Sequence, residues 1–139
     1  DVLICSEVLE HIDNPSEIAA LMRLALKPGG TAVFTVPAGK RWWSSQDVFA
    51  GHVQRFEAEE FRKMLNKAGF RVKSLEWWGI APALLYDRLT SLIGPRRAIA
   101  AGRSTLGGSV ARALYRLFMV EDLIHCRAGF QMIVVAERR

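Results

Sequence analysis

Three side chains capable of acid–base or metal chemistry follow a short apolar run at the start of the chain. The sequence reads DVLICSEVLEHI, so Glu7, Glu10 and His11 come shortly after Cys5. If these residues form one helical turn, the i, i+3 and i+4 spacing places the three side chains on one face. Two carboxylates and an imidazole on one face can bind a divalent cation such as Mg²⁺. An imidazole that titrates near neutral pH can also act as a general base.

A second imidazole, His52, lies in a polar and aromatic segment, AGHVQRF. We expect it to approach the first cluster as a fourth metal ligand or as a second candidate base. A structural role is the alternative, in which Glu10 and His11 cap a helix and pair with their neighbours. Three interpretations therefore stay open: a metal site of Glu7, Glu10, His11 and His52, a metal-free catalytic base at His11 or His52, and a structural cluster.

The elements that must position these residues have a clear order. DVLIC has no polar alternation after Asp1, which is typical of a central parallel strand buried on both faces. Asn14 and Pro15 then begin a helix, which KPGG ends, and TAVFTVP predicts a second buried strand. Strand, helix and strand in this order predict a right-handed βαβ unit with a parallel sheet.

The rest of the chain continues the alternation. EAEEFRKMLNKAGF predicts a helix and RVKSLEWWG a third strand, while APALLYDRLTSLIG and SVARALYRLFMVEDLI look helical. FQMIVVAERR predicts a last strand, and a closing strand can enter a sheet antiparallel to its neighbours. The pattern predicts an α/β domain.

Composition limits the functional classes. The chain has 139 residues, 50% of them hydrophobic, which is enough for one domain with a core. We find no signal-peptide pattern and no run near the about 18 apolar residues of a membrane span. Cys5 and Cys126 lack metal or disulfide spacing, so we expect a reducing, cytoplasmic setting.

The net charge of +5 is concentrated in one stretch. Between residues 88 and 120 there are six arginines and no acidic residue. Such a stretch could contact a membrane surface, a phosphate or a nucleic acid, or could be a solvated basic face. We expect peripheral membrane contact through residues 80–120 rather than nucleic-acid binding, because the aromatic residues lie apart from the arginines.

The motifs EVLEHI and LKPGGTAVFTVP resemble those of class I S-adenosylmethionine-dependent methyltransferases, in particular the ubiquinone-pathway type. They are similar to that family's fourth strand, following helix and fifth strand. FRKMLNKAGFRVKSLEWWG and FQMIVVAERR resemble its sixth and seventh strands. The resemblance implies the C-terminal half of a Rossmann-like methyltransferase fold, with parallel strands, a final antiparallel strand and a helical insertion at about 80–125.

The resemblance also has a clear departure. The family's glycine-rich loop after the first strand and its ribose-binding acidic residue have no counterpart in this sequence. We therefore expect residues 1–139 to form a partial methyltransferase domain without the N-terminal cofactor-binding part, and this fragment alone to be inactive.

The same resemblance implies roles for individual residues. The backbone of Cys5, Ser6 and Glu7 would face the methionine part of S-adenosylmethionine. In the ubiquinone-pathway enzymes and the small-RNA 2′-O-methyltransferases, a Glu-x-x-Glu-His run and a later His hold a metal. The loop after the fifth strand often forms the acceptor site of this fold. In this sequence its aromatic residues Trp42, Trp43, Phe49 and Phe56 could line an apolar pocket, and its cations Lys40, Arg41 and Arg55 could hold an anionic group.

The resulting functional expectation is methyl transfer to an oxygen of a small or lipid-like acceptor. The alternatives are an RNA 2′-O-methyltransferase-like enzyme and a non-catalytic fragment or membrane-surface binding module. We expect the protein to be cytoplasmic, with membrane association through the basic stretch.

Overall fold

The structure is a computed structural model that describes residues 1–79, 88, 90–92, 94, 96–97, 100, 109, 116 and 129–139. The predicted helical insertion at about 80–125 and the membrane contact predicted for 80–120 lie almost entirely outside the described residues. Among the described helices, none is long and apolar enough to cross a membrane.

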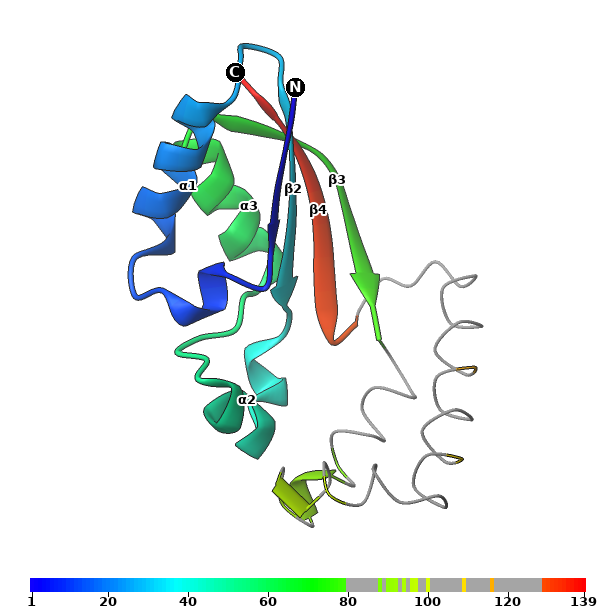
Figure 1. Cartoon of the computed structure of the whole chain (residues 1–139). Coiled ribbons are helices and arrows are strands. Elements are labelled where there is room, and N and C mark those ends of the chain that lie inside the picture. Colours follow the sequence, from blue (N-terminus) through cyan, green and yellow to red (C-terminus); the bar gives the residue numbers. More distant parts are fainter. Residues whose placement is uncertain are drawn as a thin grey trace.

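Four strands form one mixed sheet in the order β1-β2-β4-β3 (Figure 1). The strands are β1 (Val2–Ser6), β2 (Thr31–Pro37), β3 (Phe70–Trp78) and β4 (Gln131–Arg138). Strand β1 pairs with β2 in parallel, whereas β4 is antiparallel to both β2 and β3. The predicted parallel βαβ unit and final antiparallel strand are therefore confirmed.

Helices α1 (Pro15–Ala25) and α3 (Ala58–Lys67) cover the same face of the sheet (Figure 1). Alternate residues of the strands point toward them, as the two-residue period of a strand requires. Phe34 on β2 is fully buried there, with Phe61 and Phe70 packed edge-on at centroid distances of 6.1 and 5.5 Å. This aromatic group is the centre of the core.

A long segment after β2 carries the short helices of the site. It contains η2 (Lys40–Trp42) and α2 (Ser45–Ala50), and a 3-10 turn, η1 (Leu9–His11), follows β1. Ser44 and Asp47 form a capping box at the start of α2, and Gly51 ends the helix in the left-handed conformation at φ 79°. This sharp stop turns the chain back toward η1.

The prediction that the first strand is buried on both faces is wrong for the described residues. Strand β1 lies at an edge of the sheet, and its Val2 and Ile4 side chains are 67% and 72% exposed. Cys5, on the face that α1 and α3 cover, is buried. No described helix covers the other face of β1, and Val2 and Ile4 are exposed there.

We expect Phe34→Ala to lower the free energy of unfolding by about 3–5 kcal/mol, since it leaves a cavity among three aromatic rings. Equilibrium unfolding in urea, followed by circular dichroism, measures this change. Leu24→Ala is the control, because Leu24 is 60% exposed. Similar losses in both variants would contradict this description of the core.

Candidate functional site

Polar side chains gather where β1 and β2 end, at their carboxyl ends. Ser6 and Thr35 share a hydrogen bond of 2.8 Å between their hydroxyl oxygens, and the Thr35 hydroxyl donates to Glu7 Oε1 at 2.8 Å. The Gln131 amide donates to Glu7 Oε2, also at 2.8 Å. The carboxyl edge of parallel strands is where ligands bind in open α/β sheets.

Glu7 has a left-handed backbone, at φ 52°, unusual for a residue with a side chain. This turn aims its carboxylate at Thr35 and Gln131, and η1 begins only at Leu9. The prediction that Glu7 shares a helical face with Glu10 and His11 is therefore wrong. Its two carboxylate oxygens already accept hydrogen bonds, so Glu7 belongs to the strand-end network rather than to a metal-ligand cluster.

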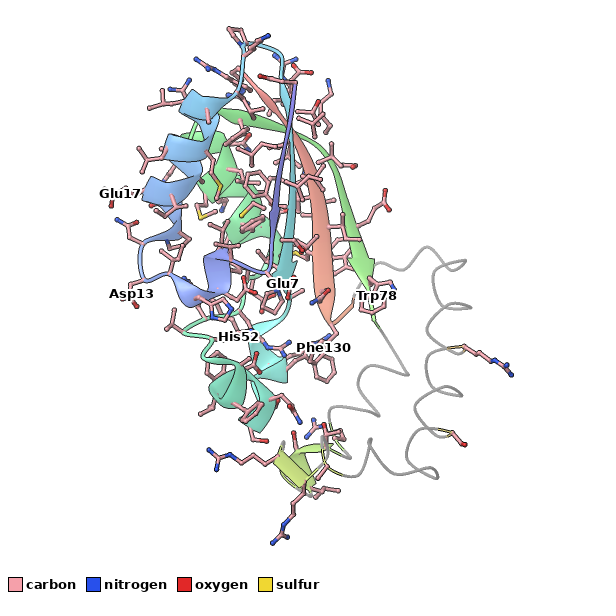
Figure 2. The ribbon with its side chains drawn as sticks, viewed as in Figure 1. Glu7, Asp13, Glu17, His52, Trp78 and Phe130 are labelled. Carbon is pink, nitrogen blue, oxygen red and sulfur yellow. The ribbon has the colours of Figure 1, made fainter. Side chains whose placement is uncertain are left out.

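Glu10, His11 and His52 do come together, as the sequence predicted. Figure 2 labels His52 of this group. One ligand atom from each lies within 4.8 Å of the others. The Nε2 atoms of His11 and His52 are each 3.9 Å from Glu10 Oε1, and the two rings meet edge-on at 4.9 Å. We call these three residues the Glu–His–His cluster.

Each histidine is held through its other ring nitrogen. His11 Nδ1 lies 3.1 Å from the Gly51 carbonyl, and His52 Nδ1 lies 2.8 Å from Asp47 Oδ1. Because a carbonyl and a carboxylate can only accept, these contacts favour a proton on Nδ1. In the neutral rings, both Nε2 lone pairs are then free on the side of Glu10, the arrangement that metal-binding histidines show.

Glu10 is the unusual member of the cluster. Its side chain is fully buried, and neither carboxylate oxygen has a hydrogen-bond partner. Burial raises the pKa of this carboxyl, and the nearby Glu7 charge adds to the effect, whereas the residue's own backbone amide and the two histidines act in the opposite direction. Its backbone carbonyl accepts from the amides of Val53 and Gln54, which ties η1 to the loop that carries His52.

Asp47 positions the His52 ring through the 2.8 Å contact between its Oδ1 and His52 Nδ1, a contact that the sequence did not predict although it groups Asp47 with His52 and Arg55 in one short segment. It is buried, and its Oδ1 also accepts from Arg55 Nε at 2.8 Å. Burial by itself would raise the Asp47 pKa, but hydrogen bonds from Arg55, His52 and the Ser44 amide outweigh it and lower the pKa. The spacing Ser-x-x-Asp before an apolar pair marks the capping box that begins α2.

Two of the predicted acceptor-binding residues are buried. Arg55, 3% exposed, pairs with Asp47 and packs against the Phe130 ring at 4.0 Å, while Phe56 belongs to the core beside Phe61. Arg55 is therefore a structural partner of Asp47, and Phe56 a core residue. Trp42, by contrast, lines a cavity next to α2.

Of the predicted cofactor-binding residues, Cys5 points into the core. Burial raises the pKa of its thiol to about 11, with a further contribution from the Glu10 charge. The resemblance implied a role for its backbone alone, and this stays a prediction. Ser6 and Glu7 lie at the open carboxyl edge.

We expect Glu10→Gln to stabilise the protein by about 1–3 kcal/mol at pH 8 in a chelator, because it removes an unpartnered buried charge. The Glu10 pKa is raised in the folded state, so its favourable contribution is complete below the unfolded pKa and is lost as the pH rises through the folded pKa. The difference in the free energy of unfolding between Glu10→Gln and the parent protein should therefore grow from pH 4 to pH 8. Urea unfolding at several pH values measures it, with the exposed Glu76→Gln as control; a pH-independent difference would argue against a buried charge.

Asp47→Asn should lower the free energy of unfolding by about 3 kcal/mol, because it leaves the Arg55 charge buried without its partner. It should also change the His52 tautomer, which ring-nitrogen NMR shifts report. Asp13→Asn, at an exposed carboxylate, is the matched control. An unchanged His52 spectrum would show that Asp47 does not position the ring.

Comparison with known protein families identifies one match to this sequence. The model of a family described as "Methyltransferase domain" matches residues 1–75. No curated protein matches the sequence significantly.

Several solved structures share the fold at low identity. An S-adenosylmethionine-dependent methyltransferase from Mesorhizobium loti is 14% identical with a TM-score of 0.58, over 99% of this chain and 61% of that one. A putative methyltransferase from Bacillus halodurans is 15% identical with a TM-score of 0.56, over 98% and 63%. The cyclase SpnF is 19% identical with a TM-score of 0.56, over 99% and 49%.

This chain thus spans about half to three fifths of the length of the structures that it resembles. The family match covers more than half of its residues, including β1, α1, β2, α3 and most of β3. The mixed sheet with its reversed β4 is the arrangement expected of a Rossmann-like methyltransferase. The chain belongs to the methyltransferase-domain family, with the fold of the class I S-adenosylmethionine-dependent methyltransferases.

Proposed function

We propose that this chain serves S-adenosylmethionine-dependent methyl transfer to an oxygen of a small or lipid-like acceptor, with a divalent cation held by Glu10, His11 and His52. One observation carries the proposal. A fully buried carboxylate without a hydrogen-bond partner faces the Nε2 atoms of two histidines, both fixed through Nδ1.

The residues present fit a divalent cation. A buried charge without a partner is costly, and a cation between Glu10 and the two imidazoles would compensate it. Two imidazoles and one carboxylate are common ligands for divalent metals, and three protein ligands leave coordination positions for an acceptor or water. The hydrogen bonds to Asp47 and the Gly51 carbonyl supply the second shell that orients such ligands.

A hydroxyl acceptor must lose a proton before or during methyl transfer. A bound cation would lower the pKa of that hydroxyl and so favour its loss at neutral pH. The remaining work of the chain is positional: η1 and the loop after α2 bring the three ligands together, and Asp47 fixes the His52 ring. Without a cation, the free Nε2 of His52 would be the proton acceptor, and this is the alternative mechanism.

The methyl donor would bind at the carboxyl edge of β1 and β2. Family membership supports this cofactor, and the edge offers the backbone of Ser6 and Glu7 beside the Glu7–Thr35 hydrogen bond. The sulfonium methyl group is already activated. The protein must therefore hold the acceptor in line with it and exclude water.

A titration of Mn²⁺, followed by the loss of its free EPR signal, tests the cation proposal directly. We expect one Mn²⁺ to bind per chain, and Glu10→Gln and His52→Gln each to weaken binding at least tenfold, since each removes a ligand. Glu7→Gln is the matched control, because Glu7 lies outside the cluster and should leave binding intact.

Two results would contradict the proposal. One is the absence of Mn²⁺ binding at millimolar concentration. The other is unchanged binding in Glu10→Gln. If the full-length protein transferred methyl groups at an unchanged rate in a chelator, the His52 base would replace the cation in the mechanism.

A further inference from the structure

A cavity of about 360 Å³ lies beside η2 and the start of α2. The described part of its lining comes from two segments far apart in the sequence and includes two arginines, two tryptophans and three serines: Arg41, Trp42, Trp43, Ser44, Ser45, Arg88 and Ser91. We call it the arginine cavity. None of its lining residues belongs to the Glu–His–His cluster.

The two arginines of this cavity differ from the neighbouring cations. Lys40 is paired with Glu60 at 2.6 Å, and Arg55 with Asp47 at 2.8 Å. In the part of the chain that the structure describes, no carboxylate pairs with Arg41 or Arg88. Two guanidinium groups therefore line one cavity without a described counter-charge.

The backbone at Gly39 makes room for the Trp42 indole. Gly39 has φ 76°, and a Cβ atom there would lie 2.5 Å from Trp42 Cδ1, so only glycine lets the indole take this place. The Trp42 amide donates to the Gly39 carbonyl at 2.9 Å. Arg41 Cζ lies 4.7 Å from the centre of the indole ring, which steadies the guanidinium as a cation–π contact.

A third polar group of the lining lacks a partner. The Ser91 hydroxyl oxygen is buried and makes no hydrogen bond. Buried hydroxyls are normally hydrogen-bonded, so an unpartnered hydroxyl in the lining is unusual. Guanidinium groups and a hydroxyl around one space match the oxygens of a phosphate, and an indole beside them matches a flat apolar group.

We propose that the arginine cavity binds the phosphate group of the methyl acceptor, with Trp42 against an apolar ring next to that phosphate. The inference rests on the proposed function only where it identifies the ligand as the acceptor. Helix α2 connects the two sites, since Ser44 and Ser45 at its start line the cavity and His52 follows its end. Its six residues span about 9 Å, a distance that a small phosphorylated acceptor can bridge.

Calorimetric titration with phenyl phosphate tests the proposal, in a chelator and without a methyl donor. We expect phenyl phosphate to bind more tightly than inorganic phosphate, and the neutral phenol not to bind. Arg41→Gln and Arg88→Gln should each weaken binding about tenfold or more, as expected for a lost charge-assisted hydrogen bond. Arg71→Gln, at an exposed arginine on β3, is the matched control.

Unchanged affinity in both cavity variants would overturn the proposal, as would equal affinity for phenol and phenyl phosphate. A third arm uses dihexanoyl phosphatidate, which carries its phosphate on a lipid; binding of this lipid without binding of phenyl phosphate would overturn the role of Trp42. Glu10→Gln should still bind phenyl phosphate. Failure of the cation proposal and failure of this one are thus separate results.

Discussion

A carboxylate buried without a hydrogen-bond partner is the constraint around which the site is organised. Glu10 is placed inside the protein by η1, and its backbone carbonyl holds the loop that brings His52 to it. Removing such a charge from water is costly, and nothing in the described part of the chain donates a hydrogen bond to it. The arrangement is understandable if stability is given up for function, as often happens at binding sites.

The segment between β2 and α3 serves this carboxylate. Asp47 makes three kinds of contact: it caps the start of α2, pairs with Arg55 and orients the His52 ring. Arg55 in turn donates to the Ala38 carbonyl and packs on Phe130, which anchors the segment to the sheet. The His52 ring is therefore held by Asp47, which is held by Arg55, and Arg55 packs on Phe130 directly before β4.

The fold alone does not decide the reaction. The cyclase SpnF and the methyltransferases share this architecture with the chain at 19% identity or less. On a shared fold, function depends on the set of side chains at the site. In this chain that set is a strand-end network at Glu7, the Glu–His–His cluster, and a cavity with two arginines.

Periodicity, glycine and proline positions were enough to predict the βαβ unit, α3 and the closing strand, because each depends on local patterns and on one covered sheet face. The meeting of Glu10, His11 and His52 was also predicted from residue types, although their partners were not. Two expectations about the first strand and the residues that follow it failed for physical reasons. The exposure of Val2 and Ile4 depends on which neighbours cover a strand, and the direction of Glu7 depends on a single backbone torsion.

By itself, the sequence determined the class of fold and the chemical groups available near the end of the first strand. Only the tertiary structure decided which of those groups meet. It buried Arg55 and Phe56, placed Arg41 and Arg88 on the lining of one cavity, and gave His52 its carboxylate partner. These outcomes depend on contacts between residues distant in the chain, and composition, periodicity and spacing carry no record of such contacts.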